Sequence, residues 1–96
     1  DFSRYPAGRY PADGKYNGQT FRRKHLVPAL QRFDKVDIFL DDAVDYGSSF
    51  LEEAFGGLVR VEHIDKSIIL TKLDLHSDFS YLIAEIREYI KDAVFE

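Results

Sequence analysis

The sequence predicts a single α/β domain, built as a two-layer sandwich with a small, mainly parallel sheet and helices mostly on one face. Segments with helical and strand periodicity alternate along the chain, which is typical of parallel strands joined by right-handed crossovers. The predicted strands alternate apolar and polar residues, so one face of the sheet should be covered and the other partly wet. A length of 96 residues leaves no room for a second domain.

The opening residues 1–18 should form an extended segment that runs into a loop, because they are rich in Gly, Pro, Tyr and Arg without a sustained period. Residues 19–96 make up the alternating body of helices and strands. Two strands make a thin sheet, so the opening segment or a strand upstream of Asp1 should add to it. The chain contains no Met, and we therefore expect an initiator residue and further residues upstream.

The first helix is predicted over residues 20–33, where apolar side chains recur along one broad side. Asn17 or Thr20 can cap it. Pro28 should kink this helix, because proline lacks the N–H that would reach the carbonyl of Lys24.

The first strand is predicted over residues 35–41, where apolar and more polar side chains alternate. After a turn, a second helix is predicted over residues 48–61, and a second strand over residues 67–75. A last helix, capped by Ser77 or Asp78, should extend nearly to the end of the chain, because its apolar residues form one stripe at helical spacing.

Composition argues against several classes of function. The absence of Cys excludes disulfides, thiolate metal sites and cysteine nucleophiles. No apolar run approaches the roughly 20 residues needed to span a bilayer, and no signal peptide opens the chain, so a cytoplasmic protein without a membrane partner is expected. No set of nucleophile, base and orienting group stands out, so we expect neither a catalytic centre nor a cofactor.

The net charge of −4 hides an asymmetry between the two parts of the chain. Residues 1–35 carry eight Lys and Arg against three Asp, whereas residues 36–96 carry five against fourteen acidic residues. Such a split can mark a basic contact surface on an acidic body, although local charge can also average out on folding.

Basic residues interleaved with Tyr in the first part would suit a nucleotide phosphate or a single-stranded nucleic acid. A small-ligand or nucleic-acid sensor is therefore the alternative function. The candidate contacts are Arg4, Arg9, Arg22 and Arg23. Against nucleic acid stands the sequence pI of about 5.3, since dedicated nucleic-acid binders tend to be basic.

Acidic residues cluster at the carboxyl end of the first strand, where open α/β sheets usually bind ligands. They are Asp41, Asp42 and Asp45. Clustered carboxylates can hold Mg²⁺, but such a run is also typical of a solvated turn, so no metal site is assigned.

The most distinctive segment, residues 46–60, follows a strand and opens a helix with Gly-Ser-Ser-Phe-Leu, then Glu-Ala-Phe-Gly-Gly-Leu. It resembles the turn of STAS domains, the fold of bacterial anti-sigma factor antagonists. It is more similar to the STAS-like domains of unknown function, whose pattern contains both parts of this segment. The further matching residues are Pro6, Gly8, Arg9, Asp13, Gly14, Gly18, Phe21 and Arg22, while Ala7 stands where the family pattern has Gly.

The resemblance implies a STAS-like sheet of about four strands and a regulatory binding role instead of catalysis. In antagonists, the second Ser of the turn is phosphorylated by a histidine-kinase-like ATPase, and phosphorylation blocks binding. By position that residue is Ser49, with Ser48 beside it. This chain has Gly47 where antagonists have Asp, and Phe50 where they have Gly. The resemblance implies a bacterial protein partner, either an ATPase of that class or a sigma-type regulator.

The residues themselves also allow a structural explanation of this segment. Ser49 and Glu52 have the spacing of a capping box, which would account for Ser49 without a switch. On a helix, five residues share the polar half: Glu52, Glu53, Gly56, Gly57 and Arg60. Each glycine costs about 1 kcal/mol relative to Ala and fills no core. Close approach by a partner explains them, and so does packing against the chain's own N-terminal segment.

The sequence thus predicts a non-catalytic regulatory module that binds a protein partner. The predicted contact surface is the strand-to-helix turn and the helix after it, residues 48–60.

Overall fold

A computed structural model describes residues 6–41 and 46–96. The elements follow in the order η1 (Pro11–Asp13), α1 (Gly18–Phe21), η2 (Arg22–Leu26), α2 (Val27–Arg32), β1 (Val36–Phe39), α3 (Ser48–Leu51), η3 (Glu52–Gly56), α4 (Gly57–Arg60), α5 (Lys66–Lys72), β2 (Leu73–His76) and α6 (Ser80–Asp92). Here η1 is a 3-10 turn, and η2 and η3 are π-helical turns inside longer helices. The described chain is thus a helix-dominated α/β domain.

The first helix runs without a break through α1, η2 and α2, close to the bounds predicted from the sequence. Asn17 caps it, because its Oδ1 accepts a hydrogen bond from the Thr20 N–H at 2.9 Å. The Val27 N–H reaches back five residues to the Arg22 carbonyl, which widens the helix by one π-helical turn directly before Pro28. The π-helical turn is the irregularity that the structure shows beside Pro28, where the sequence predicted a kink.

The sheet consists of β1 and β2, paired in parallel. Their side chains alternate between a buried face, with Val36, Leu73 and Leu75, and an open face. The parallel pairing expected from the alternation of strands and helices is confirmed. The expected four strands are not confirmed, because the described residues contribute two strands to the sheet.

The strand predicted over residues 67–75 is wrong in its first part, where the chain forms the helix α5 before β2 begins. Asp65 caps α5, since its Oδ1 accepts from the Ser67 N–H at 2.8 Å. A short apolar run such as Ile68 to Leu70 fits either periodicity. The cap at Asp65 marks the start of a helix, and Ile69 is the residue of α5 that is buried.

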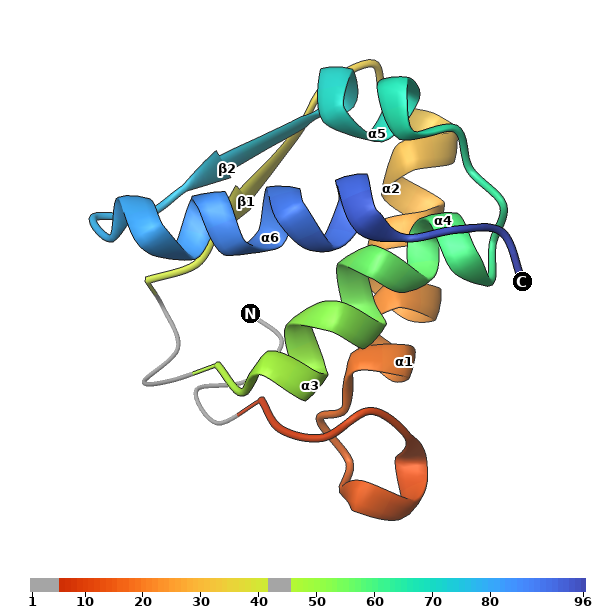
Figure 1. The fold of residues 1–96 in the computed structure, drawn as a ribbon, viewed down its shortest axis with the longest axis vertical. Helices are drawn as coiled ribbons and strands as arrows, with labels where there is room; N and C mark the ends of the chain where they lie inside the picture. Colours follow the sequence, from red (N-terminus) through yellow and green to blue (C-terminus); the bar gives the residue numbers. More distant parts are fainter. Residues whose placement is uncertain (1–5, 42–45) are drawn as a thin grey trace.

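The helices pack together beside the buried face of the sheet. In Figure 1 both strands run from α5 toward the start of α6, and α6 then doubles back across the helix formed by α3, η3 and α4. That helix, Ser48–Arg60, is called the central helix below. The most deeply buried apolar residues come from the central helix, α5 and α6: Leu51, Ala54, Leu58, Ile69 and Ile86.

The last helix, α6, is confirmed, and its buried stripe consists of Leu82, Ile86 and Ile90. The predicted cap at Ser77 or Asp78 is wrong, because Phe79 is the N-cap of α6 and its side chain makes no cap hydrogen bond. Ser77 Oγ accepts a hydrogen bond from the Phe79 N–H at 3.0 Å, just before the helix. Within the described ranges, no helix combines the length and apolar character that crossing a membrane requires.

Candidate functional site

The polar side of the central helix, predicted as a docking surface, faces the chain's own N-terminal part. There it forms a group of ion pairs, called the Arg–Glu cluster here. The cluster comprises Arg9, Arg22, Arg60, Glu52, Glu53 and Glu62. Two of the eight basic residues of the N-terminal part, Arg9 and Arg22, thus meet glutamates of the central helix inside the molecule.

The centre of the cluster is the pair Arg22–Glu53, whose side chains are 1% and 2% exposed. Arg22 Nη1 donates to Glu53 Oε2 at 2.7 Å and to the Glu53 carbonyl at 2.6 Å. Arg22 Nε donates to Glu62 Oε2 at 2.9 Å. A buried ion pair is tolerated when such hydrogen bonds satisfy both partners. In this structure, Arg22 is therefore not placed to contact an external phosphate, nor Glu53 a partner.

The two glycines of the central helix are also buried against the chain itself. A Cβ on Gly57 would lie 2.1 Å from Arg22 Nη1. A Cβ on Gly56 would lie 2.6 Å from Glu52 Oε2 and 3.4 Å from the Tyr89 carbonyl of α6. Of the two explanations that the sequence left open, the structure shows internal packing, because a side chain at Gly57 would occupy the place of the Arg22 guanidinium.

The outer part of the cluster is formed by Arg9, Arg60 and Glu52. Arg9 Nη1 and Arg60 Nη1 each donate to one carboxylate oxygen of Glu52, and Arg60 Nη2 donates to Glu53 Oε1 at 3.2 Å. Desolvation raises the pKa of Glu52, but the hydrogen bonds from Arg9 and Arg60 outweigh it and leave the pKa below its usual value. Arg9 is the most accessible arginine of the cluster, with 37% of its side chain exposed.

Backbone hydrogen bonds hold Arg9 in position. The Gly18 N–H donates to the Gly8 carbonyl and the Gln19 N–H to the Arg9 carbonyl, both at 2.9 Å. Gly8 has φ 81°, a conformation that glycine adopts without strain. The described part of the predicted opening loop is thus tied to the start of the first helix. Arg4 lies outside the described residues, and Arg23 is exposed.

Ser48 and Ser49 are exposed in the first turn of the central helix. The predicted capping box is wrong, because Gly47 is the N-cap and Ser49 lies inside the helix. The Leu51 N–H donates to the Gly47 carbonyl at 3.2 Å, while Glu52 pairs with arginines instead of reaching back. Ser49 therefore does not have the capping role that was predicted from the sequence.

Ser48 lies beside α6, where the Tyr89 hydroxyl donates to Glu85 Oε2 at 2.6 Å. This hydrogen bond to Glu85 raises the pKa of Tyr89, and a hydrogen bond with Ser48 opposes the shift. The amino end of the central helix is thus linked to α6 by polar side chains, while Ser49 is not part of that link.

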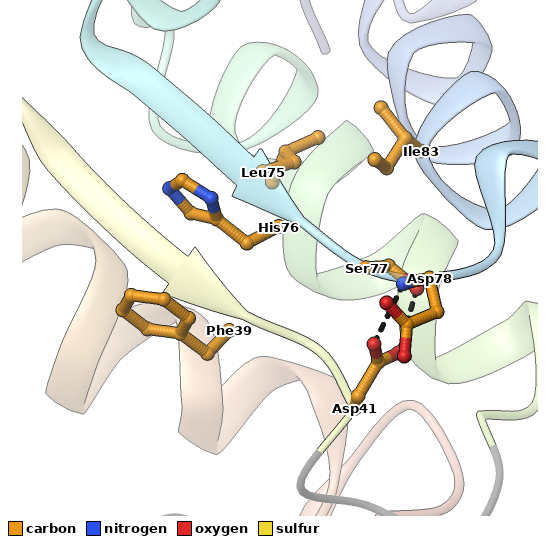
Figure 2. Close-up of a pocket in the computed structure, with 7 residues that line it drawn as sticks. All are labelled: Phe39, Asp41, Leu75, His76, Ser77, Asp78 and Ile83. Atoms are coloured by element: carbon orange, nitrogen blue, oxygen red, sulfur yellow. Dashed lines mark hydrogen bonds between the residues drawn. The ribbon is translucent and has the colours of Figure 1, made fainter.

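A shallow hollow of about 470 Å³ lies at the carboxyl ends of the strands, lined by Phe39, Asp41, Leu75, His76, Ser77, Asp78 and Ile83 (Figure 2). Asp41 accepts from the Ser77 hydroxyl at 2.7 Å and from the Asp78 N–H at 2.6 Å, and both bonds lower its pKa. Asp41 thus joins the ends of the two strands. Asp42 and Asp45 lie outside the described residues.

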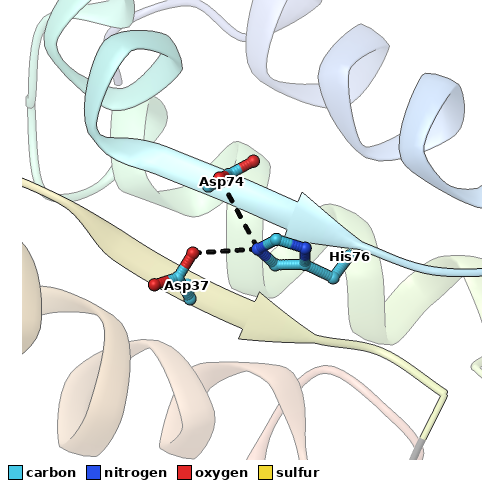
Figure 3. A group of neighbouring side chains, drawn as sticks. All are labelled: Asp37, Asp74 and His76. Atoms are coloured by element: carbon cyan, nitrogen blue, oxygen red, sulfur yellow. Dashed lines mark hydrogen bonds and ion pairs between the residues drawn. The ribbon is translucent and has the colours of Figure 1, made fainter.

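The open face of the sheet carries a group of side chains that the sequence analysis missed: Asp37, Asp74 and His76 (Figure 3). Asp74 and His76 are two residues apart in one strand, which places both on one face. The strand predicted over residues 67–75 includes Asp74 but ends one residue before His76. What the sequence could not show is the register that brings Asp37 from β1 to them.

A family model described as STAS-like domain of unknown function (DUF4325) matches residues 17–78, from the cap of the first helix to the end of the second strand. Searches of the curated proteins and of the solved structures found no match.

Proposed function

Since the chain belongs to the STAS-like domains of unknown function, we propose that it is a regulatory module that binds a protein partner at the exposed start of its central helix. The contact is made by Gly47, Ser48 and Ser49, the exposed residues of this region. The observation that carries the proposal is the burial pattern of the central helix. Every residue from Phe50 to Val59 is buried except the half-buried Glu52, so an approaching partner meets the first turn.

The proposed switch is phosphorylation of Ser49. Its hydroxyl is reachable, because the residue is exposed and is not occupied as a cap. A phosphate there would lie at the positive end of the helix dipole. The carboxylate of Glu52, one turn further, is paired with Arg9 and Arg60, which reduces its repulsion of a phosphate.

Arg9 is the group through which such a charge would act. Its half-exposed side chain donates a hydrogen bond to Glu52, so a phosphate on Ser49 would compete with Glu52 for the Arg9 guanidinium. The added charge would also change the surface that the partner contacts. In the resembling antagonists, phosphorylation blocks binding, and we propose the same direction here. The proposed partner is a histidine-kinase-like ATPase or a sigma-type regulator.

The alternative function, a sensor of nucleotides or nucleic acid, is not retained. Arg22, one of its four contacts, is buried in the Arg–Glu cluster and engaged inside the molecule.

The test is capture of partners from native extract by the wild type, Ser49→Asp, Ser49→Ala and Ser80→Asp. Ser80 is a matched control, because it is also exposed at the start of a helix. A captured protein would then be purified and its Kd measured with each variant, after circular dichroism has shown that each variant is folded.

We expect Ser49→Asp to weaken binding by about tenfold or more, a difference of about 1.4 kcal/mol. Ser49→Ala and Ser80→Asp should leave the Kd unchanged. Equal binding by wild type and Ser49→Asp would overturn the proposed switch. Failure of a Gly47→Arg variant to weaken binding would overturn the proposed surface.

A further inference from the structure

The register of the sheet places two carboxylates directly opposite each other on its open face. Asp37 pairs with Asp74 across the strands. Two residues further along each strand, and on the same face, Phe39 pairs with His76. The two Asp side chains are 57% and 63% exposed. Like charges at directly opposed positions destabilise a sheet. A cation between them would turn this repulsion into attraction.

The third member of the group points its ring toward both carboxylates (Figure 3). His76 Nε2 lies 2.8 Å from Asp37 Oδ1 and 3.5 Å from Asp74 Oδ2. One ligand atom from each residue lies within 4.8 Å of the other two. Bonds of about 2.0–2.2 Å from a central ion to nitrogen and oxygen ligands place neighbouring ligand atoms roughly 3 Å apart. The two separations from His76 Nε2, 2.8 Å and 3.5 Å, are therefore close to those between neighbouring ligands of one ion.

We propose that Asp37, Asp74 and His76 bind one divalent transition-metal ion on the open face of the sheet, with Zn²⁺ as the best-fitting ion. Imidazole nitrogen favours Zn²⁺ and its neighbours over Mg²⁺ and Ca²⁺, which prefer oxygen ligands throughout. Both strands hold their ligands at fixed positions in the ladder, so the site is built on regular structure and not on a loop.

Two further features suit such a site. The Phe39 ring stacks on the His76 imidazole with 4.7 Å between the ring centroids and 15° between their planes, which restrains the ring orientation. The His76 side chain is 40% exposed. Three protein ligands on an accessible face leave at least one coordination position to water, as in open zinc sites.

The experiment is isothermal titration of ZnCl₂ into the full chain, without an affinity tag and after treatment with a chelator. MgCl₂ is titrated in parallel. The ligand variants are Asp37→Asn, Asp74→Asn and His76→Gln, which keep similar side-chain shapes. The matched controls are Asp92→Asn and His63→Gln, because both residues are exposed and lie outside the group. A Zn²⁺ titration followed by NMR of the imidazole nitrogens reports which His changes.

We expect one Zn²⁺ per chain, a resonance shift at His76, and a loss of affinity of roughly tenfold or more in each ligand variant. The controls should bind as the wild type does, and Mg²⁺ should bind more weakly. The proposal is overturned if no stoichiometric binding occurs, or if His63→Gln weakens binding as much as His76→Gln. It is equally overturned if His76→Gln binds Zn²⁺ like the wild type, which would leave a hydrogen bond between His76 and Asp37 as the role of the pair.

Discussion

Arg22 and Glu53 form a buried ion pair, with 2.7 Å between Arg22 Nη1 and Glu53 Oε2. The pair joins the π-helical turn of the first helix to the π-helical turn of the central helix. Gly57 leaves room for it, because a Cβ there would occupy the position of the guanidinium. The polar side of the central helix is thus a structural contact between two helices, and the exposed surface of that helix is confined mainly to its start.

Removing the charge of Glu53 should strongly destabilise the domain. Glu53→Gln leaves the buried Arg22 without its charged partner, and breaking a buried pair in this way costs about 3–5 kcal/mol. For a domain of this size, that is a large part of the total stability. The free energy of unfolding in urea measures the loss.

The matched control for this change is Glu88→Gln on α6, because Glu88 is exposed. It should alter the free energy of unfolding by less than about 0.5 kcal/mol. If Glu53→Gln costs as little as Glu88→Gln, the pair does not stabilise the packing of the two helices.

Gly18→Ala should destabilise the contact between the first helix and the central helix. A Cβ on Gly18 would lie 2.6 Å from the Phe50 carbonyl and 3.1 Å from the Ala54 nitrogen. Both are backbone atoms, so the two helices must move apart, and overpacking of this kind costs about 1–3 kcal/mol. The shift of the urea midpoint measures this cost.

Gly47→Ser is the comparison for Gly18→Ala, since an added Cβ at Gly47 meets no atom within 4 Å. Serine is also a favourable N-cap, so this variant should be neutral or slightly stabilising. A loss for Gly47→Ser equal to that for Gly18→Ala would contradict the steric explanation.

Glu52 should contribute stability that disappears in acid. Its folded pKa lies below the usual value of 4.5, because the hydrogen bonds from Arg9 and Arg60 outweigh desolvation. The contribution is therefore fully present above pH 4.5 and is lost as the pH falls through the lower folded pKa. Urea unfolding of the wild type and Glu52→Gln between about pH 7 and pH 3 isolates this effect. The difference in stability should shrink below pH 4.5. A difference that stays constant or grows in acid would show that the carboxylate is not the stabilising form.

The hydroxyl of Ser77 should control the titration of Asp41. Its hydrogen bond is the main cause of the lowered pKa of Asp41, followed by the bond from the Asp78 N–H. In Ser77→Ala, the pKa of Asp41 should rise toward its usual value of 3.8, as measured by NMR of the carboxyl carbon during a pH titration.

A second Ser–Asp pair provides the control for that titration. Ser67 lowers the pKa of Asp65 by the same kind of hydrogen bond at the start of α5. Ser67→Ala should raise the pKa of Asp65 and leave that of Asp41 unchanged. If Asp41 titrates identically in the wild type and Ser77→Ala, the link between the two strand ends does not exist in solution.

Sequence periodicity alone determined the first helix, the central helix, the first strand and α6 at nearly their observed bounds. In each case a long or regular apolar pattern marks the element, and for the first helix the predicted cap, Asn17, is also correct. The motif in residues 46–60 also determined the family. For α5 the apolar pattern was too short to distinguish a helix from a strand, and the structure shows a helix capped by Asp65.

Only the tertiary structure decided what the polar residues of the central helix do. Helical spacing places Glu53 and Gly57 on the side away from the apolar core residues, but it does not show whether that side faces water or another helix. The answer depends on Arg22, which lies 31 positions before Glu53 and reaches it only after the chain has folded. The grouping of Asp37, Asp74 and His76 on the open face of the sheet could not be predicted for the same reason. It depends on the register between two strands that are far apart in the sequence.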